Sequence, residues 1–533
     1  MTRSLLVSVF AGMLGVLFLV AAPALASPSC SHIATLGIPD TVIEQIAAVG
    51  AGPFNVPGPP PPPGAPKREP VMLPAFCRVQ GHIKPAIKFE VWLPYDTWNG
   101  NFEEVGNGGF AGTIQYGPMI AALKAGYATA STDTGHVGGG TEWAPGHPEL
   151  VMDYGYRAIH ELTMKAKTMI EDYEGAAPRL SYFNGCSNGG RQGLMEAQRY
   201  PNDYDGILVG APANPWTAFE LGDMLWHTLA TMKDAESFIP TEKLAAIDDA
   251  TAAACDELDG TKDGLISDPR KCKFDPSTLV CKGADSPTCL TAKQADALKM
   301  IYAGVPPVNG KPVFPATMPG GERGWGNFMT AGGPMKTTSF NLANNFFKNL
   351  VYEDPNWDFH SWDYTKGVAD TQKKLSSVLD ATDYNLKPFA MHGGKMLMYH
   401  GWSDPVVSPL NTVNQYKLMV TALTGAKPGT FDQETAAFTA ANEKAQDTIR
   451  LFMAPGMSHC GGGDGPSVFD AFTPLTMWVE KKQAPQQIIA SHMTNNKPDR
   501  TRPLCPYPTT AQYSGQGSID DASNFACKAP VSR

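Results

Sequence analysis

The stretch that most constrains the fold is LSYFNGCSNGGRQGLMEAQR, at residues 180–199. Residues 180–183 are apolar and are followed by Asn-Gly, which predicts a short buried strand. Residues 189–199 are rich in helix formers, which predicts a helix. The five residues between them, GCSNG at 185–189, match G-x-S-x-G, the pattern of a nucleophile held on a sharp strand-to-helix turn. We therefore expect Ser187 to be a nucleophile; the alternative is an ordinary capping serine in a glycine-rich turn.

Strand-like and helix-like segments alternate along much of the chain. Further strands are predicted at 88–93, 101–105, 127–132, 207–209, 395–400 and 450–453, and further helices at 153–170, 412–424 and 470–481. This alternation is typical of a mostly parallel sheet with helices on both faces. The predicted fold class is α/β.

The alternation stops after residue 213 and resumes near residue 391. The residues between, 214–390, hold four cysteines and many aromatic side chains, including Trp216, Trp226, Trp325, Phe346, Phe347, Trp357 and Trp362. A cap built over a catalytic face would have this character, and we expect an inserted lid domain; an independent domain is the alternative. The core would then comprise residues 71–213 and 391–533.

The first 70 residues are predicted to lie outside the core. Arg3, the apolar run 5–20 and an A-x-A site ending at Ala26 predict a signal peptide over residues 1–26. The alternative is an uncleaved anchor, but the run is short for a membrane span. Residues 27–70 would form an arm in which five consecutive prolines act as an extended spacer. We expect a secreted or periplasmic protein with no stable membrane insertion after cleavage.

The formal net charge of −10, with no basic run, argues against a nucleic-acid partner. All ten cysteines follow the predicted signal peptide, in a chain bound for an oxidising compartment, so disulfides are expected. Pairing does not follow from sequence alone, but spacing suggests four pairs: Cys30 with Cys77, Cys255 with Cys272, Cys281 with Cys289, and Cys505 with Cys527.

Two further residues follow predicted strands at one edge of the sheet. His459 lies in the loop after the strand at 450–453, and Asp404 lies just after the strand at 395–400. Their chain order after Ser187 is the order of the α/β-hydrolase triad. We expect His459 to take the serine proton and Asp404 to orient and stabilise the imidazole. The alternatives are a structural loop histidine and a turn aspartate before a proline.

The two remaining cysteines adjoin these residues. Cys186 precedes Ser187, and Cys460 follows His459. If the serine and the histidine are within hydrogen-bond reach, their neighbours are near enough for a disulfide, which needs α-carbons about 4.4–6.8 Å apart. We expect that bridge; the alternative is two free, buried cysteines.

A glycine-rich stretch, GNGGF at 106–110, follows the predicted strand at 101–105. A glycine there would let a backbone N–H approach a substrate oxygen, and the N–H of Asn188 would supply a second donor of an oxyanion hole. Gly109 is favoured over Gly108 as the first donor. The alternative is a plain glycine turn.

Three aspartates cluster in the run CDELDGTKDGLISD at 255–268. The run D-x-T-x-D-G-x-I follows the start of a calcium loop, but Arg270 stands where an EF-hand carries an acid, so an EF-hand is excluded. Three close carboxylates repel unless they are solvated or bound to a hard cation. The expected calcium ligands are Asp256, Asp259 and Asp263, with the carbonyls of Thr261 and Leu265. We expect a structural Ca²⁺ site within the lid; the alternative is a polar surface turn.

Taken together, these motifs resemble the tannase and feruloyl esterase family. The resemblance rests on the Cys-Ser and His-Cys pairs, the D-x-x-D-G-x-x-D-G loop, the aromatic lid and the remaining cysteine spacing. It implies a secreted serine esterase with an α/β-hydrolase core and a large lid that holds a structural calcium ion. Members cleave esters of aromatic acids: gallates, hydroxycinnamates and, in one bacterial branch, mono(2-hydroxyethyl) terephthalate.

By similarity, Ser187, Asp404 and His459 would form the triad, with the Cys186–Cys460 bridge beside it. The expected activity is hydrolysis of a small aromatic ester through an acyl-enzyme, without an organic cofactor. A feruloyl-type ester is the first expectation, followed by tannin and terephthalate monoesters. An acyltransferase and a lectin-like calcium-binding module with a vestigial triad are the other readings. The oligomeric state stays open.

Overall fold

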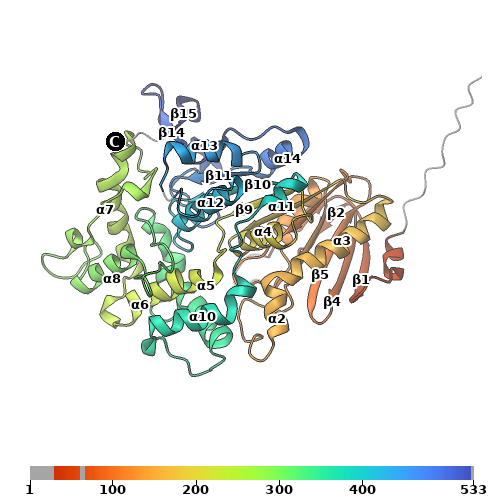
Figure 1. Ribbon diagram of the computed structural model, residues 1–533, viewed down its shortest axis with the longest axis horizontal. Helices are drawn as coiled ribbons and strands as arrows, with labels where there is room; N and C mark the ends of the chain where they lie inside the picture. The colour runs from red at the N-terminus through yellow and green to blue at the C-terminus, as the bar shows by residue number, and fades with distance from the viewer. Residues whose placement is uncertain (1–28, 60–66, 432, 530–533) are drawn as a thin grey trace, which may run out of the picture.

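The computed structural model describes residues 29–59, 67–431 and 433–529 of the chain (Figure 1). The predicted signal peptide, 1–26, and most of the proline run lie outside the described residues. Among the residues described, no helix combines the length and apolar character that a membrane span requires.

The strands are β1 (Thr41–Val49), β2 (Gly52–Phe54), β3 (Val71–Leu73), β4 (Phe76–Ile83), β5 (Ile87–Pro94), β6 (Asn101–Val105), β7 (Ala128–Thr132), β8 (Leu180–Cys186), β9 (Gly206–Gly210), β10 (Lys395–Gly401), β11 (Ile449–Ala454), β12 (Ile488–Thr494), β13 (Lys497–Leu504), β14 (Thr510–Tyr513) and β15 (Phe525–Lys528). The α-helices are α1 (Tyr116–Lys124), α2 (Pro148–Met152), α3 (Ala158–Glu174), α4 (Asn188–Arg199), α5 (Trp216–Phe219), α6 (Trp226–Met232), α7 (Leu244–Cys255), α8 (Ala292–Ala303), α9 (Thr338–Asn345), α10 (Tyr364–Leu379), α11 (Lys387–His392), α12 (Pro409–Thr424), α13 (Ala436–Ala445) and α14 (Phe472–Lys481).

A nine-stranded sheet, counted over the described residues, organises the molecule in the order β1-β4-β5-β7-β6-β8-β9-β10-β11. The pairs from β1 to β7 are antiparallel, and those from β7 to β11 are parallel. Because parallel strands end at one edge, the carboxyl ends of β8, β10 and β11 meet there. This is the predicted mostly parallel sheet, and it confirms the α/β-hydrolase fold.

Helices cover both faces of the sheet, as predicted. On one face, α3, α4 and α12 bury side chains such as Leu162, Leu194 and Tyr416 against the strands. On the other face, α1 packs Leu123 and α14 packs Trp478. Both faces of the parallel strands are therefore removed from water, which explains why β6, β7, β9 and β11 are buried at every position.

Residues 214–390 leave the sheet after β9 and return to it before β10. They contain helices α5 to α10 and the start of α11, and several of these helices form the lobe opposite β1 (Figure 1). We call this segment the insertion. A shared apolar cluster joins it to the core, because Trp216 and Phe346 pack in the same cluster as Phe110 and Tyr154.

The predicted N-terminal arm contributes to the sheet, which the sequence analysis did not anticipate. Residues Thr41–Val49 form the edge strand β1, antiparallel to β4, and the Cys30–Cys77 bridge fixes the segment before it. The burial of β1 is only partial, so its sequence lacks the continuous apolar run that revealed the central strands.

Candidate active site

The turn between β8 and α4 holds Ser187 in a strained conformation. Its φ of 65° and ψ of −122° lie where non-glycine residues are rare. A Cβ at Gly185 would lie 2.5 Å from the backbone of Gly189, so the turn has no room for a side chain there. The backbone of Ser187 is fixed, because its N–H donates to Gly210 O (3.0 Å) and its carbonyl accepts from Arg191 N–H (3.0 Å). The local structure has the form of a nucleophile elbow, with a partly exposed Ser187 at its tip.

Asp404 and His459 meet at the same edge of the sheet. The Nδ1 atom of His459 lies 2.7 Å from Asp404 Oδ2. The two loops that carry them are tied together, because Ser403 N–H donates to Met457 O (3.1 Å). A Cβ at Gly401 would lie 2.1 Å from Met457 O, so only glycine permits this crossing. Both residues follow strands, as predicted, and the structure brings them into contact.

The Asp404 carboxylate is buried yet well supplied with donors. Its Oδ1 accepts the N–H groups of Val406 (2.7 Å) and Val407 (3.0 Å), and its Oδ2 also contacts His400 Nε2 (2.9 Å). Burial acts to raise its pKa, but His459 and His400 outweigh burial and hold the pKa well below its usual value. An ionised Asp404 requires a hydrogen on His459 Nδ1, which leaves Nε2 as the acceptor of the ring.

A disulfide connects the serine turn to the histidine loop. Cys186 and Cys460 are bonded, with their α-carbons 6.0 Å apart. Within the described chain, no hydrogen bond joins Ser187 Oγ to His459. Such catalytic hydrogen bonds are often long in ligand-free structures and tighten when a substrate binds. The bridge holds the Ser187 turn beside the His459 loop by joining two cysteines that are 274 positions apart in sequence.

The other predicted cysteine pairs are also confirmed. The described cysteines form the bridges Cys30–Cys77, Cys255–Cys272, Cys281–Cys289 and Cys505–Cys527, and none of them is free.

The glycine-rich loop after β6 lies against the start of α4. A Cβ at Gly189 would lie 3.0 Å from Asn107 O, and the N–H of Asn107 donates to Gln192 Oε1 (2.9 Å). Gly109 has a φ of +52°, and its carbonyl accepts the Tyr154 hydroxyl (3.0 Å). The loop therefore lies beside the first turn of α4, next to Ser187 and Asn188.

Arg191 is a buried residue of this region that the sequence analysis missed. Its Nε donates to Asn188 Oδ1 (2.7 Å), and its guanidinium donates to three backbone carbonyls, those of Tyr154, Gly155 and Leu379. Burial lowers its pKa. Arg191 thus ties the residue after Ser187 to α10 of the insertion. In the sequence, an arginine on the first turn of a helix looks like a surface residue, so no local signal marked Arg191 as buried.

The insertion reaches the loops of Asp404 and His459. The ring of Phe328, in the π-helical turn Gly326–Thr330, lies 6.2 Å from the His459 ring, centroid to centroid. A Cβ at Gly321 would lie 2.4 Å from the Ser403 side chain. Aromatic surface of the insertion therefore borders the histidine directly.

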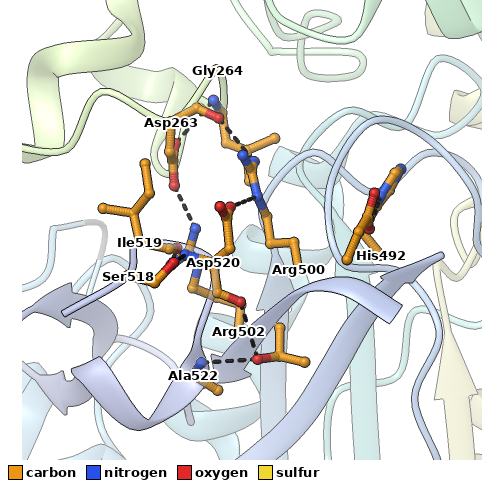
Figure 2. A network of polar contacts seen from close by, with 12 residues as sticks. Asp263, Gly264, His492, Arg500, Arg502, Ser518, Ile519, Asp520 and Ala522 are labelled. Atoms are coloured by element: carbon orange, nitrogen blue, oxygen red, sulfur yellow. Dashed lines mark hydrogen bonds and ion pairs between the residues drawn. The ribbon is translucent and has the colours of Figure 1, made fainter. Parts of the chain in front are cut away.

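The acidic loop after α7 is folded around its own carboxylates. Asp256 accepts the N–H groups of Asp263 (3.2 Å) and Gly264 (3.0 Å), and Asp259 accepts that of Thr261 (2.8 Å). Figure 2 shows Asp263 facing two arginines of β13: Arg502 donates to Asp263 Oδ2 (2.5 Å), and Arg500 donates to Asp263 O (2.8 Å). The five predicted ligands offer only carboxylate and carbonyl oxygens, which is the donor set that Ca²⁺ prefers.

A second group of possible metal ligands lies between α3 and α4. His160, Glu196 and Asp203 bring one ligand atom each within 4.8 Å of one another. His160 Nδ1 already pairs with Asp203 (2.6 Å). Burial, with the neighbouring charges of Asp203 and Glu104, raises the pKa of Glu196 well above its usual value.

Comparison with known proteins identifies the family of the chain. The profile of the family described as "Tannase and feruloyl esterase" matches residues 71–528. An uncharacterized esterase of Xanthomonas campestris pv. campestris is 38% identical, over 94% of this chain and 91% of its own. The mono(2-hydroxyethyl) terephthalate hydrolase of Piscinibacter sakaiensis is 33% identical, over 86% of this chain and 85% of its own.

The fold comparison gives the same result. The crystal structure of feruloyl esterase B from Aspergillus oryzae superposes with a TM-score of 0.82 at 27% identity, over 93% of this chain and 98% of that one. The family match covers the first part of the predicted core, the whole insertion, and the second part of the core as far as residue 528. The chain is therefore a member of the tannase and feruloyl esterase family, and it is a carboxylic ester hydrolase.

Proposed function

We propose that the protein is a secreted serine esterase that hydrolyses esters of aromatic acids through an acyl-enzyme. The observation that carries this proposal is the joint geometry of the serine turn and the histidine loop. Ser187 is strained and partly exposed, its neighbour is bridged to the neighbour of His459, and His459 Nδ1 pairs with Asp404. These are the parts that serine hydrolysis needs.

In the proposed mechanism, His459 Nε2 takes the proton of Ser187 as Oγ attacks the ester carbonyl. Asp404 holds the imidazole in position and stabilises its positive charge. The N–H groups of Gly109 and Asn188 stabilise the negative charge on the carbonyl oxygen. The alcohol then leaves with the proton from His459. Water repeats these steps on the acyl-enzyme, with His459 as base, and releases the acid.

We assign the insertion the role of a lid. Phe328 lies beside His459 and offers an aromatic face where the acyl or alcohol group would lie. This contact supports an aromatic substrate. A feruloyl-type ester is the first candidate, and mono(2-hydroxyethyl) terephthalate is the second, since a relative of that name matches most of the chain.

We further propose a structural Ca²⁺ ion held by Asp256, Asp259, Asp263 and the carbonyls of Thr261 and Leu265. Bound there, the ion would neutralise the acidic loop of the lid. Export to an oxidising compartment is proposed from the signal-like N-terminus, and the five disulfides support it.

The decisive experiment is a side-by-side assay of methyl ferulate, methyl gallate and mono(2-hydroxyethyl) terephthalate. Wild type should hydrolyse at least one of them, while Ser187→Ala should hydrolyse none and should keep the melting temperature of wild type. A covalent serine probe should label wild type alone. Equal labelling, or activity of Ser187→Ala near that of wild type, would exclude this nucleophile. Preferential transfer of the acyl group to an added alcohol would identify an acyltransferase instead.

A further inference from the structure

A second histidine contacts the carboxylate of Asp404. His400, in β10, is completely buried. Its Nε2 lies 2.9 Å from Asp404 Oδ2, the oxygen that also receives His459, and 3.1 Å from Val407 O. Its Nδ1 lies 2.7 Å from the hydroxyl of Thr412, in α12. The ring therefore spans the distance from the helix to the acid of the proposed triad.

The partners of His400 define where its hydrogen lies. Nε2 faces two oxygen acceptors, so it must carry a hydrogen. Nδ1 faces a hydroxyl, which can donate to it. All contacts are satisfied when Nε2–H points at Asp404 and the Thr412 hydroxyl points at Nδ1. His400 then acts toward Asp404 as a fixed donor.

We propose that His400 is a positioning residue of the esterase site: it fixes the Asp404 carboxylate through Nε2–H, in the orientation that receives His459 Nδ1. This proposal rests on the proposed triad. Two backbone N–H groups hold one oxygen of Asp404, and the two histidines share the other. Without His400, Oδ2 would lose its buried anchor and would be held only by His459, whose side chain is 18% exposed.

The electrostatic consequence has a definite sign. A hydrogen bond from His400 withdraws negative charge from Oδ2. When it is removed, the carboxylate attracts a protonated His459 more strongly. The acid limb of the pH profile of kcat/KM, which reports protonation of the base in the free enzyme, should then move to higher pH.

A further ionisable group, Asp223, lies beside Asp404. Asp223, in the π-helix Glu220–Leu225 of the insertion, faces Asp404 and accepts Ser408 N–H (2.9 Å). Burial raises the pKa of Asp223 well above its usual value. His459, His400 and Asp223 are the titratable groups that the described structure brings against Asp404.

A matched pair of variants isolates the contact. The amide nitrogen of glutamine reaches roughly where Nε2 of histidine lies, whereas that of asparagine reaches only Nδ1. His400→Gln should keep the donor to Asp404, with activity near that of wild type and an unchanged pH profile. His400→Asn should lower kcat/KM about 10- to 100-fold, the worth of a hydrogen bond to a charged group. The variant should lower kcat rather than raise KM, and the acid limb of its pH profile of kcat/KM should move to higher pH.

The outcomes separate this proposal from the proposed function. If wild type and Ser187→Ala are equally inactive, the proposed function fails. If wild type is active and His400→Asn and His400→Gln show the same loss of activity and the same pH profile, His400 is merely structural and the proposal is wrong. Wild-type activity of His400→Asn would also refute the proposal. If His400→Asn does not fold, Thr412→Val replaces it, because loss of the hydroxyl loosens the His400 ring. This variant should show a smaller loss of kcat and a shift of the acid limb in the same direction, to higher pH. An unchanged pH profile would overturn the proposal.

Discussion

Asp404 and Glu103 are both fully buried acids of the same sheet, yet their surroundings drive their pKa values in opposite directions. Asp404, just beyond β10, has four donors, and its pKa is held well below normal. Glu103, inside β6, accepts one hydrogen bond from Asn184 (3.1 Å), and burial raises its pKa to about 8. The chain thus builds an anion at the edge of the sheet and a neutral acid within it. The number of hydrogen-bond donors around each carboxyl group, rather than the depth of its burial, decides whether it is charged.

The largest test of this contrast is Asp404→Asn. Because a neutral amide would favour the wrong tautomer of His459, kcat should fall about 10⁴-fold. The melting temperature should change little in comparison. Steady-state kinetics and thermal unfolding measure both, with Ser187→Ala as the inactive control. A variant that keeps more than a tenth of wild-type kcat would show that Asp404 is not the orienting acid.

The Cys186–Cys460 bridge should have the next largest effect. Replacing both cysteines by serine releases the serine turn from the histidine loop, so kcat should drop about tenfold or more, because small misplacements of catalytic groups are costly. Stability should fall by up to about 5 kcal/mol, since the bridge closes a very long loop. The control removes Cys281–Cys289, which closes only eight positions, and should leave kcat unchanged. Equal kinetics for the two variants would show that the Cys186–Cys460 bridge does not position the catalytic groups.

Calcium removal should affect stability more than chemistry. Unlike Asp404, the acids of the 255–268 loop lie beside one another, and Asp263 faces Arg500 and Arg502. An ion present at 100 times its dissociation constant would contribute about 2.7 kcal/mol to the free energy of unfolding. A chelator should therefore lower the melting temperature, and Ca²⁺ but not Mg²⁺ should restore it. An unchanged melting temperature in the chelator, with no calcium found by elemental analysis, would exclude the site.

The smallest effect should come from Glu103→Gln. In the folded protein Glu103 keeps its proton to about pH 8, whereas an unfolded glutamate ionises near 4.5. The folded-state pKa is raised, so the stability from this group is present below about pH 4.5 and is lost as the pH rises toward about 8. Gln cannot ionise, so the variant should lose less stability over this interval. Thermal unfolding of variant and wild type between these pH values checks this prediction. If the stability of both falls in parallel with pH, the raised pKa of Glu103 is contradicted.

Much of this architecture was predictable because its signals are local. The strand-turn-helix around Ser187, the order of Asp404 and His459, and the spacing of the local cysteine pairs can all be recognised in short stretches. Cys186 and Cys460 were the exception, far apart in sequence, and they were paired by reasoning from their neighbours. The α/β fold followed from alternating apolar runs, each buried on both faces of the sheet.

The parts that escaped prediction depend on distant partners. β1 is half-exposed and gains its place by pairing with β4, whose residues lie 27 to 42 positions further along the chain. Arg191 is satisfied by backbone carbonyls from α10 and from the turn before α3, and His400 by an acid four residues on and a threonine in α12. Polar side chains with such partners look like surface residues in a sequence, because nothing local reveals their burial.

The bond between Cys186 and Cys460 has a topological consequence. Everything from 186 to 460, including helices α5 to α11, belongs to a single covalent ring. A protease that cuts once within this ring opens it but releases no fragment, so the nicked molecule stays in one piece until a reductant acts. A single cut in a loop of the insertion would thus leave Ser187 and His459 joined through the bridge.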